Sequence, residues 1–328
     1  MAFDNIQLEI YVYSGISSGY SSSDKKYTLN KQIITGETKI NFEISELVRD
    51  FINIEFNDDY ASYAAWVRTD ATIRDENNTE FSYGSPVSNT YLALDGYGYF
   101  EEGISPELSR NALITTNTLY IPENTAGKLP IFAEGVGKVT IDSSDTQITD
   151  NGNTNQKIQY VTIPANSSTI KVYDTDDTTL KKTININNVC EPKYTFYKVT
   201  FVNKFGAFQD LYFFKKTTER FEVTDETYKR NIFENANVTY DTHRGQRERY
   251  NTNARTSITL NTGFVNEDFN SAIEELFLSE KVFIRWQGQT LSVIPKSKSL
   301  KLNTSVNDKL SNYTVDFEFA FNKINNVR

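Results

Sequence analysis

The sequence predicts a mainly β protein made of several sandwich or barrel modules, the C-terminal one with a flanking α-helix. The first observation behind this prediction is the composition: 20 Tyr and 22 Phe stand beside a single Met, and Ile, Val and Thr are abundant. Such side chains fit a pleated, half-buried surface. The second observation is periodicity, because apolar and polar residues alternate along several segments as they do in strands with one buried face.

A chain of 328 residues is longer than one compact core usually is, so we expect three domains. Residues 1–134 are expected to form a β-rich N-terminal domain with one short helix. Residues 135–190 are expected to form a small β-sandwich insert or linker module. Residues 191–328 are expected to form a C-terminal sandwich with a helix at about 266–280.

In the N-terminal region, apolar and polar residues alternate over 6–13, which predicts a strand. Over 41–51 the apolar residues are spaced i, i+3, i+4 and i+7, which predicts a helix with one buried face. Strands are expected again over 63–67 and 90–94, and Asp95-Gly96 is a turn signal after them.

The middle region contains short segments rich in Thr, Asn and β-branched residues. Strands are predicted over 138–141, 158–163, 170–173 and 183–186. Asn151-Gly152 has the composition of a hairpin turn.

The C-terminal region has the most regular pattern. Alternation over 197–201 and 313–321 predicts two strands, and 281–286 predicts a third. Between them an apolar stripe follows Asn266, a candidate N-cap, and acidic residues in the first turn complement the dipole of the predicted helix.

Composition argues against most catalytic mechanisms and against a metal centre. The chain has one His, His243, and one Cys, Cys190, too few for a catalytic triad or a metal centre, and no glycine-rich phosphate motif. Asp174 to Asp177 could suggest calcium, but the segment lacks the Gly and the final Glu of an EF-hand loop, so a solvated turn is expected. We therefore predict no catalytic residue, no metal and no cofactor.

Charge and hydropathy limit the partners. A net charge of −9 and a pI near 4.9 argue against specific nucleic-acid binding. The sequence shows no apolar run of about 18 residues, so no membrane span is expected. It also shows no secretory signal at its start, so folding in the cytoplasm is expected.

A basic cluster over 229–255 is the sharpest local departure from this acidic composition, and Tyr and Phe residues are interleaved with it. Three interpretations stay open: a charged loop or hairpin, an interface between subunits, and contact with DNA. Arginine and tyrosine are common anchors of interfaces. Arg244, Arg247 and Arg249 are therefore the candidate interface residues.

Two segments resemble structural proteins of phages that infect Bacteroidota, including crAss-like phages. They are residues 198–214 (KVTFVNKFGAFQDLYFF) and 311–320 (SNYTVDFEFA). The resemblance covers about 191–328 and implies a role in the virion. A sandwich flanked by one helix is also similar to the tail-tube and related ring-forming folds of tailed phages.

The predicted function is a non-enzymatic virion subunit that forms or decorates a multimeric ring of the tail, neck or hub. Its expected partners are copies of itself and other virion proteins, and its expected place is the virion tail or neck after assembly in the host cytoplasm. The first alternative is a phage adhesin or carbohydrate-binding module that uses Trp66 or Trp286 on a host glycan. The second alternative is a polysaccharide hydrolase with two facing acids.

Overall fold

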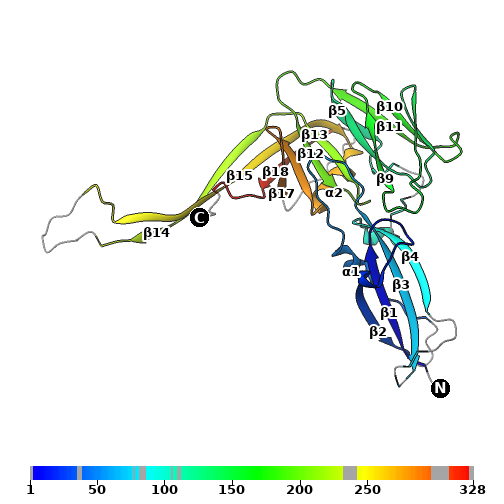
Figure 1. The fold of residues 1–328 in the computed structure, drawn as a ribbon. Coiled ribbons are helices and arrows are strands. Elements are labelled where there is room, and N and C mark those ends of the chain that lie inside the picture. Colours follow the sequence, from blue (N-terminus) through cyan, green and yellow to red (C-terminus); the bar gives the residue numbers. More distant parts are fainter. Residues whose placement is uncertain are drawn as a thin grey trace. The chain divides into compact units, whose positions relative to one another are not determined.

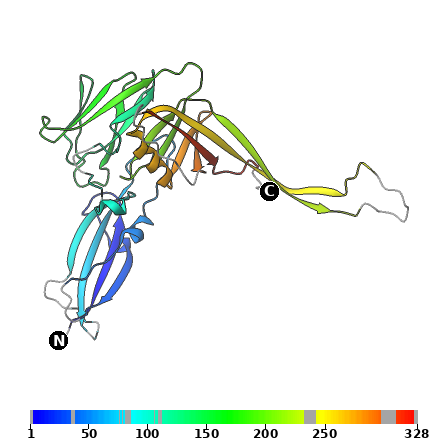
Figure 2. The same ribbon diagram turned by 180° about the vertical axis from the view of Figure 1, so that it is seen from behind.

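The protein is described by a computed structural model that covers residues 3–34, 39–75, 77, 79–80, 86–104, 106–108, 112–231, 242–296 and 310–324. Strands account for 52% of the residues and helical turns for 7%, which confirms the predicted mainly β fold with several sheets (Figures 1 and 2). The chain divides into two compact units. The first contains Met1–Cys190, Thr200–Leu211 and Asp268–Lys281, and the second contains Glu191–Val199, Tyr212–Glu267 and Val282–Arg328.

The first unit begins with a four-stranded antiparallel sheet of order β2-β1-β3-β4. Its strands are β1 (Phe3–Tyr13), β2 (Lys25–Gln32), β3 (Ala64–Asp75) and β4 (Val87–Leu94). The alternation in β1 places Leu8, Ile10 and Val12 on one face, where they form a core cluster with residues of β3. The predicted strands over 6–13, 63–67 and 90–94 are thus confirmed.

The helix predicted over 41–51 is confirmed as α1 (Ser45–Arg49), which is shorter than the apolar pattern. Val48 is buried in the cluster, and Ile44 and Leu47 pack against it. Phe51, the last residue of the predicted stripe, follows the helix and lies against Tyr27 of β2. The stripe therefore covers the sheet although only part of it is helical.

Two further sheets complete the first unit: a five-stranded sheet of order β5-β11-β10-β7-β8 and the pair β6-β9. Their strands are β5 (Thr118–Pro122), β6 (Gly127–Phe132), β7 (Lys138–Ile141), β8 (Ser144–Gln147), β9 (Ile158–Ile163), β10 (Thr169–Tyr173) and β11 (Leu180–Val189). All four strands predicted in the middle region are confirmed. The two sheets meet at Gly127, where an added Cβ would lie 2.8 Å from the Ile121 side chain.

Strand pairing crosses residue 134. β5 and β6 precede it, yet β5 pairs in parallel with β11 and β6 pairs with β9. The division into 1–134, 135–190 and 191–328 stays a prediction. Asn151-Gly152 is a turn but joins no paired strands; the tight hairpin connects β7 and β8 through Asp142, whose φ of 53° is supported by hydrogen bonds from the Ser168 and Thr169 N–H groups to its carboxylate.

The seven-stranded sheet has the order β13-β12-β16-β17-β18-β15-β14. Its strands are β12 (Tyr197–Val202), β13 (Phe208–Phe213), β14 (Thr218–Lys229), β15 (Arg247–Asn266), β16 (Val282–Trp286), β17 (Gln289–Pro295) and β18 (Leu310–Phe319). β14 to β18 belong to the second unit. Tyr313, Val315 and Phe317 of β18 are buried and alternate with exposed residues, which confirms the predicted pattern.

The predicted C-terminal helix is confirmed as α2 (Phe269–Leu278), with its apolar stripe buried. Asn266 is the last residue of β15 and does not cap the helix; the residue before α2 is Asp268. The Asp268 carboxylate accepts hydrogen bonds from the N–H groups of Asn117 and Thr118. Within the described ranges, neither helix has the length and apolar character that crossing a membrane requires.

Candidate functional site

The β14–β15 hairpin is the most unusual feature of the second unit. β18 pairs with β15 only from Ser257 onward, so residues 221–229 of β14 and 247–256 of β15 form a two-stranded ribbon, called the arm below (Figure 1). All 12 residues of β14 are exposed on both faces. A two-stranded ribbon by itself is marginally stable in water, and β14 lacks the burial that normally stabilises a strand, whereas Ala254 and Thr256 of β15 are buried.

A β-bulge divides the arm into two parts. Thr224 pairs with Asn253 and Glu226 with Tyr250, so one residue of β14 opposes two residues of β15. Asn251, in the bulge, has a φ of 50°, a conformation that Asn tolerates better than most residues. Bulges bend a strand and fix which side chains share a face.

The distal part of the arm has a basic face. Lys229 lies directly opposite Arg247, and the neighbouring pair on this face is Thr227 and Arg249. Like charges in direct cross-strand positions destabilise a ribbon. Arg249 forms an ion pair of 2.8 Å with Asp225, and its side chain is still 58% exposed. Neither Lys229 nor Arg247 has an ion pair with a residue that the structure describes, so two cations on this face lack a compensating charge.

The opposite face of the distal part carries tyrosines. The rings of Tyr228 and Tyr250 meet edge to face, 5.8 Å apart. The Tyr228 hydroxyl donates a 2.6 Å hydrogen bond to Glu248, which raises the pKa of Tyr228 and lowers the pKa of Glu248. Arg230 also pairs with Glu248 at 3.4 Å. Glu248 and Arg230 on the tyrosine face are thus paired within the arm, whereas Lys229 and Arg247 on the basic face are not paired with any described residue.

The candidate interface residues divide between these locations. Arg247 and Arg249 lie on the basic face, and Arg244 is exposed in the turn that precedes β15. Lys229 is the third cation of the basic face. It lies opposite Arg247 because of the bulge. His243 is exposed in the same turn.

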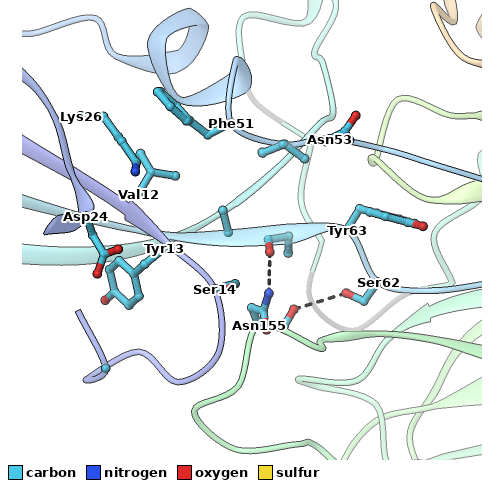
Figure 3. Close-up of a pocket in the computed structure, with 14 residues that line it drawn as sticks. Val12, Tyr13, Ser14, Asp24, Lys26, Phe51, Asn53, Ser62, Tyr63 and Asn155 are labelled. Carbon is cyan, nitrogen blue, oxygen red and sulfur yellow. Dashed lines mark hydrogen bonds between the residues drawn. The ribbon is translucent and has the colours of Figure 1, made fainter. Parts of the chain in front are cut away.

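A cavity of the first unit lies beside β1 and β3 and has a volume of about 650 Å³ (Figure 3). Its polar groups are mostly committed to structure. The Asn155 side chain donates to the Ala64 carbonyl at 2.6 Å, and the Ser62 hydroxyl donates to the Asn155 carbonyl at 3.3 Å. Asp24 is the one carboxylate among its described lining residues, and it accepts hydrogen bonds from Ser21. This cavity therefore lacks the pair of facing acids that glycoside hydrolysis uses.

The two tryptophans proposed for glycan binding are half-buried and already have partners. The Trp66 indole N–H donates to the Gly15 carbonyl at 3.1 Å. The Trp286 ring stacks on Tyr197 with centroids 5.0 Å apart, so one of its faces is covered. The glycan interpretation stays a prediction.

The acidic turn at 174–177 uses its carboxylates locally. Asp176 accepts hydrogen bonds from the Thr179 hydroxyl and from the N–H groups of Thr179 and Thr178, which hold its pKa well below the usual range. Asp174 pairs with Lys181 at 2.7 Å. In the part of the chain that the structure describes, no three His, Cys, Asp or Glu side chains are grouped as a metal site would require. Cys190 is exposed.

The segment 198–214 that carries the phage resemblance contains a tight turn between β12 and β13. The buried Asn203 amide donates to the Leu113 carbonyl at 2.6 Å, and its oxygen accepts from the N–H groups of Phe205 and Ala207. Gly206 has a φ of 74°, and an added Cβ would lie 3.1 Å from the Asp95 backbone. The motif Asn203 to Gly206 therefore has a structural explanation.

Comparison with known proteins gives no information on what these features do. No protein-family model matches the sequence, and no curated protein matches it significantly. Function has therefore to be inferred from the described residues themselves.

Proposed function

We propose that this protein is a non-enzymatic structural subunit that assembles with copies of itself through the arm. The observation that carries the proposal is a ribbon with every β14 residue exposed. Its apolar residues Phe221 and Val223 are 57% and 47% exposed. Assembly would bury these side chains and give the uncompensated cations acidic partners.

We place the subunit in the tail, neck or hub of a tailed-phage virion. The support for this place is the resemblance of residues 198–214 and 311–320 to virion proteins of phages that infect Bacteroidota. A ring of copies is the form of assembly that this resemblance implies, with other virion proteins as further partners.

The test is the mass of the purified chain, measured by light scattering and native mass spectrometry over a range of concentrations. The double variant Arg247→Glu and Arg249→Glu should raise the concentration needed for assembly by at least about tenfold, because reversed charges repel the acidic partner. Arg220→Glu is the matched control, since Arg220 lies in β14, the other strand of the same hairpin, with its side chain toward the face opposite to the basic face. A wild-type chain that stays monomeric at all concentrations would contradict the proposal.

A further inference from the structure

A loop of the first unit presents an apolar tip to solvent. It runs over residues 97–104 and contains the 3-10 turn Phe100–Glu102. The Phe100 side chain is fully exposed and Ile104 is 72% exposed. Gly103 closes the turn with a φ of 67°. Two large apolar side chains are seldom exposed so close together on the surface of a soluble protein. Such exposed apolar patches are typical of contact sites.

The loop is held in place although its tip is exposed. The Tyr97 N–H donates to the Lys204 carbonyl at 2.8 Å, and the Lys204 ammonium lies 5.0 Å from the Tyr99 ring and 3.4 Å from the Glu102 carboxylate. Tyr97 and Tyr99 contact each other edge to face. Because these anchors fix the loop, Phe100 is presented with little ordering cost on binding.

The loop is also acidic. Glu101 is exposed and has no ion pair with a described residue, and Glu102 lies beside it. Burial raises the pKa of Tyr99, and the negative charges of Glu274 and Glu275 of α2 raise it further, which places two more carboxylates within electrostatic reach of the loop. The tip therefore combines apolar side chains with negative charge.

Three other exposed acids differ from Glu101 because their carboxylates already have partners. Asp142 accepts hydrogen bonds from Ser168 and Thr169, and Asp145 pairs with Lys138 at 3.0 Å. Asp176 accepts from the backbone of its own turn. The loop at 97–104 thus combines an uncommitted carboxylate with a bare apolar tip.

The arm has the complementary surface. Phe221 and Val223 lie on the face of β14 that continues toward Lys229, because residues separated by two share a face of a strand. Apolar side chains are therefore followed by the basic face of Lys229, Arg247 and Arg249. The loop offers Phe100 and Ile104 beside Glu101, so the two surfaces match in both apolar character and charge.

We infer that the acceptor for the arm is the loop 97–104 of a second copy of this chain. The inference rests on the proposed function and names the partner surface of the same site. Because arm and loop are different patches, the contact is heterologous: each copy gives its arm to one neighbour and receives the arm of another. Such contacts propagate into a closed ring or an open filament.

Charge exchange between chains tests the pairing. Lys229→Glu with Arg247→Glu makes the arm acidic, and Glu101→Lys makes the loop less acidic while leaving the Glu102–Lys204 pair intact. Each variant alone should need at least about tenfold more protein to assemble. An equimolar mixture should recover assembly, because the acidic arm meets the loop that carries Glu101→Lys and a wild-type arm meets a wild-type loop. Glu123→Lys, at another exposed acid, is the control and should assemble normally.

Apolar contact is tested by Phe100→Ser, which should weaken assembly, whereas Leu180→Ser, at another exposed apolar residue, should not. Proximity is tested by cysteine pairing in chains that carry Cys190→Ser. Phe100→Cys in one chain and Val223→Cys in another should give a disulfide-linked dimer on oxidation of the mixture and little in either chain alone.

The outcomes separate this inference from the proposed function. If the wild-type chain assembles and the arm variant does not, but Glu101→Lys and Phe100→Ser assemble like wild type and the cysteines do not cross-link, the arm has another acceptor and the inference is wrong. If the wild-type chain stays monomeric, the proposed function fails, and the inference fails with it. Recovery in the mixture together with the cross-link supports both.

Discussion

Asn203 organises the turn between β12 and β13 from a fully buried position. Its amide group donates to the Leu113 carbonyl and to Gln209, and accepts from the N–H groups of Phe205 and Ala207. Buried polar groups are costly when they lose their partners. One side chain thus forms hydrogen bonds with backbone groups of two segments that are distant in the sequence.

Asn203→Leu should lower the free energy of unfolding by about 2 to 4 kcal/mol, because the substitution leaves two N–H groups and one carbonyl without partners. Urea denaturation followed by circular dichroism measures the change. Asn30→Leu, at an exposed position of β2, is the control and should change stability by less than about 0.5 kcal/mol. Equal stability of the two variants would show that water replaces the lost hydrogen bonds.

Glu275 is the second residue whose environment yields a prediction. It is fully buried in α2, and burial raises its pKa above the ordinary value of 4.5, although hydrogen bonds from Thr115 and from the Lys204 N–H oppose the shift. Lys204 attracts its charge and Glu274 repels it. The half-buried Lys182 also lies within electrostatic reach, and desolvation lowers its pKa to about 8.

Because the folded pKa of Glu275 exceeds the unfolded value, its neutral form stabilises the fold fully below about pH 4.5, and this contribution is lost as the pH rises through the folded pKa. Glu275→Gln keeps the shape without the charge. The variant should match wild type at low pH and be more stable by roughly 1 kcal/mol or more at pH 7. Thermal unfolding at several pH values measures this, with exposed Glu274→Gln as control; parallel curves for Glu275→Gln and wild type would contradict it.

At the scale of elements, β14 is an edge strand whose residues are all exposed, and over 221–229 its partner β15 does not pair with β18. β10, in contrast, lies between β7 and β11, and its Ile170 and Val172 are fully buried. Local stability should therefore differ greatly between these two strands.

Hydrogen exchange should distinguish them. We expect the amides of β14 to exchange quickly in the dilute monomer and at least about tenfold more slowly in the assembled protein, because assembly covers the ribbon. The amides of β10 should be protected in both states. If assembly left exchange in β14 unchanged, the arm would not be part of the contact.

At the scale of the whole molecule, a net charge of −9 means that copies of this chain repel one another at long range. Assembly then depends on a local surface of opposite sign, and the basic face of the arm supplies one. Salt screens both the repulsion and the attraction, so the response of wild type alone does not isolate the arm.

The difference between wild type and the double variant Arg247→Glu and Arg249→Glu does isolate it. The expected tenfold difference in the concentration for assembly should narrow as salt rises from about 0.1 M to 1 M, because the screening length falls from about 10 Å to about 3 Å. Light scattering at the two salt concentrations gives both values. A difference independent of salt would mean that the arginines act through packing rather than charge.

Local patterns determined much of this fold. β1 and β18 follow from alternation, because successive residues of a strand with one buried face alternate between apolar and polar. The stripe of α2 follows from helical spacing for the same reason. The prediction of no histidine- or cysteine-based catalysis rests on composition alone, and the cluster containing Arg247 and Arg249 is visible as a local excess of charge.

Only the tertiary structure decided which segments pair and which surfaces remain bare. The parallel pairing of β5 with β11 joins residues far apart in the chain, and no local pattern encodes it. β14 is not predicted from the alternation of apolar and polar residues, because neither of its faces is buried. The bulge in β15 opposite Asp225 shifts the pairing of the two strands by one residue, so that Lys229 lies opposite Arg247 on the same face. Pairing, exposure and register depend on contacts between distant residues, whereas periodicity and composition do not.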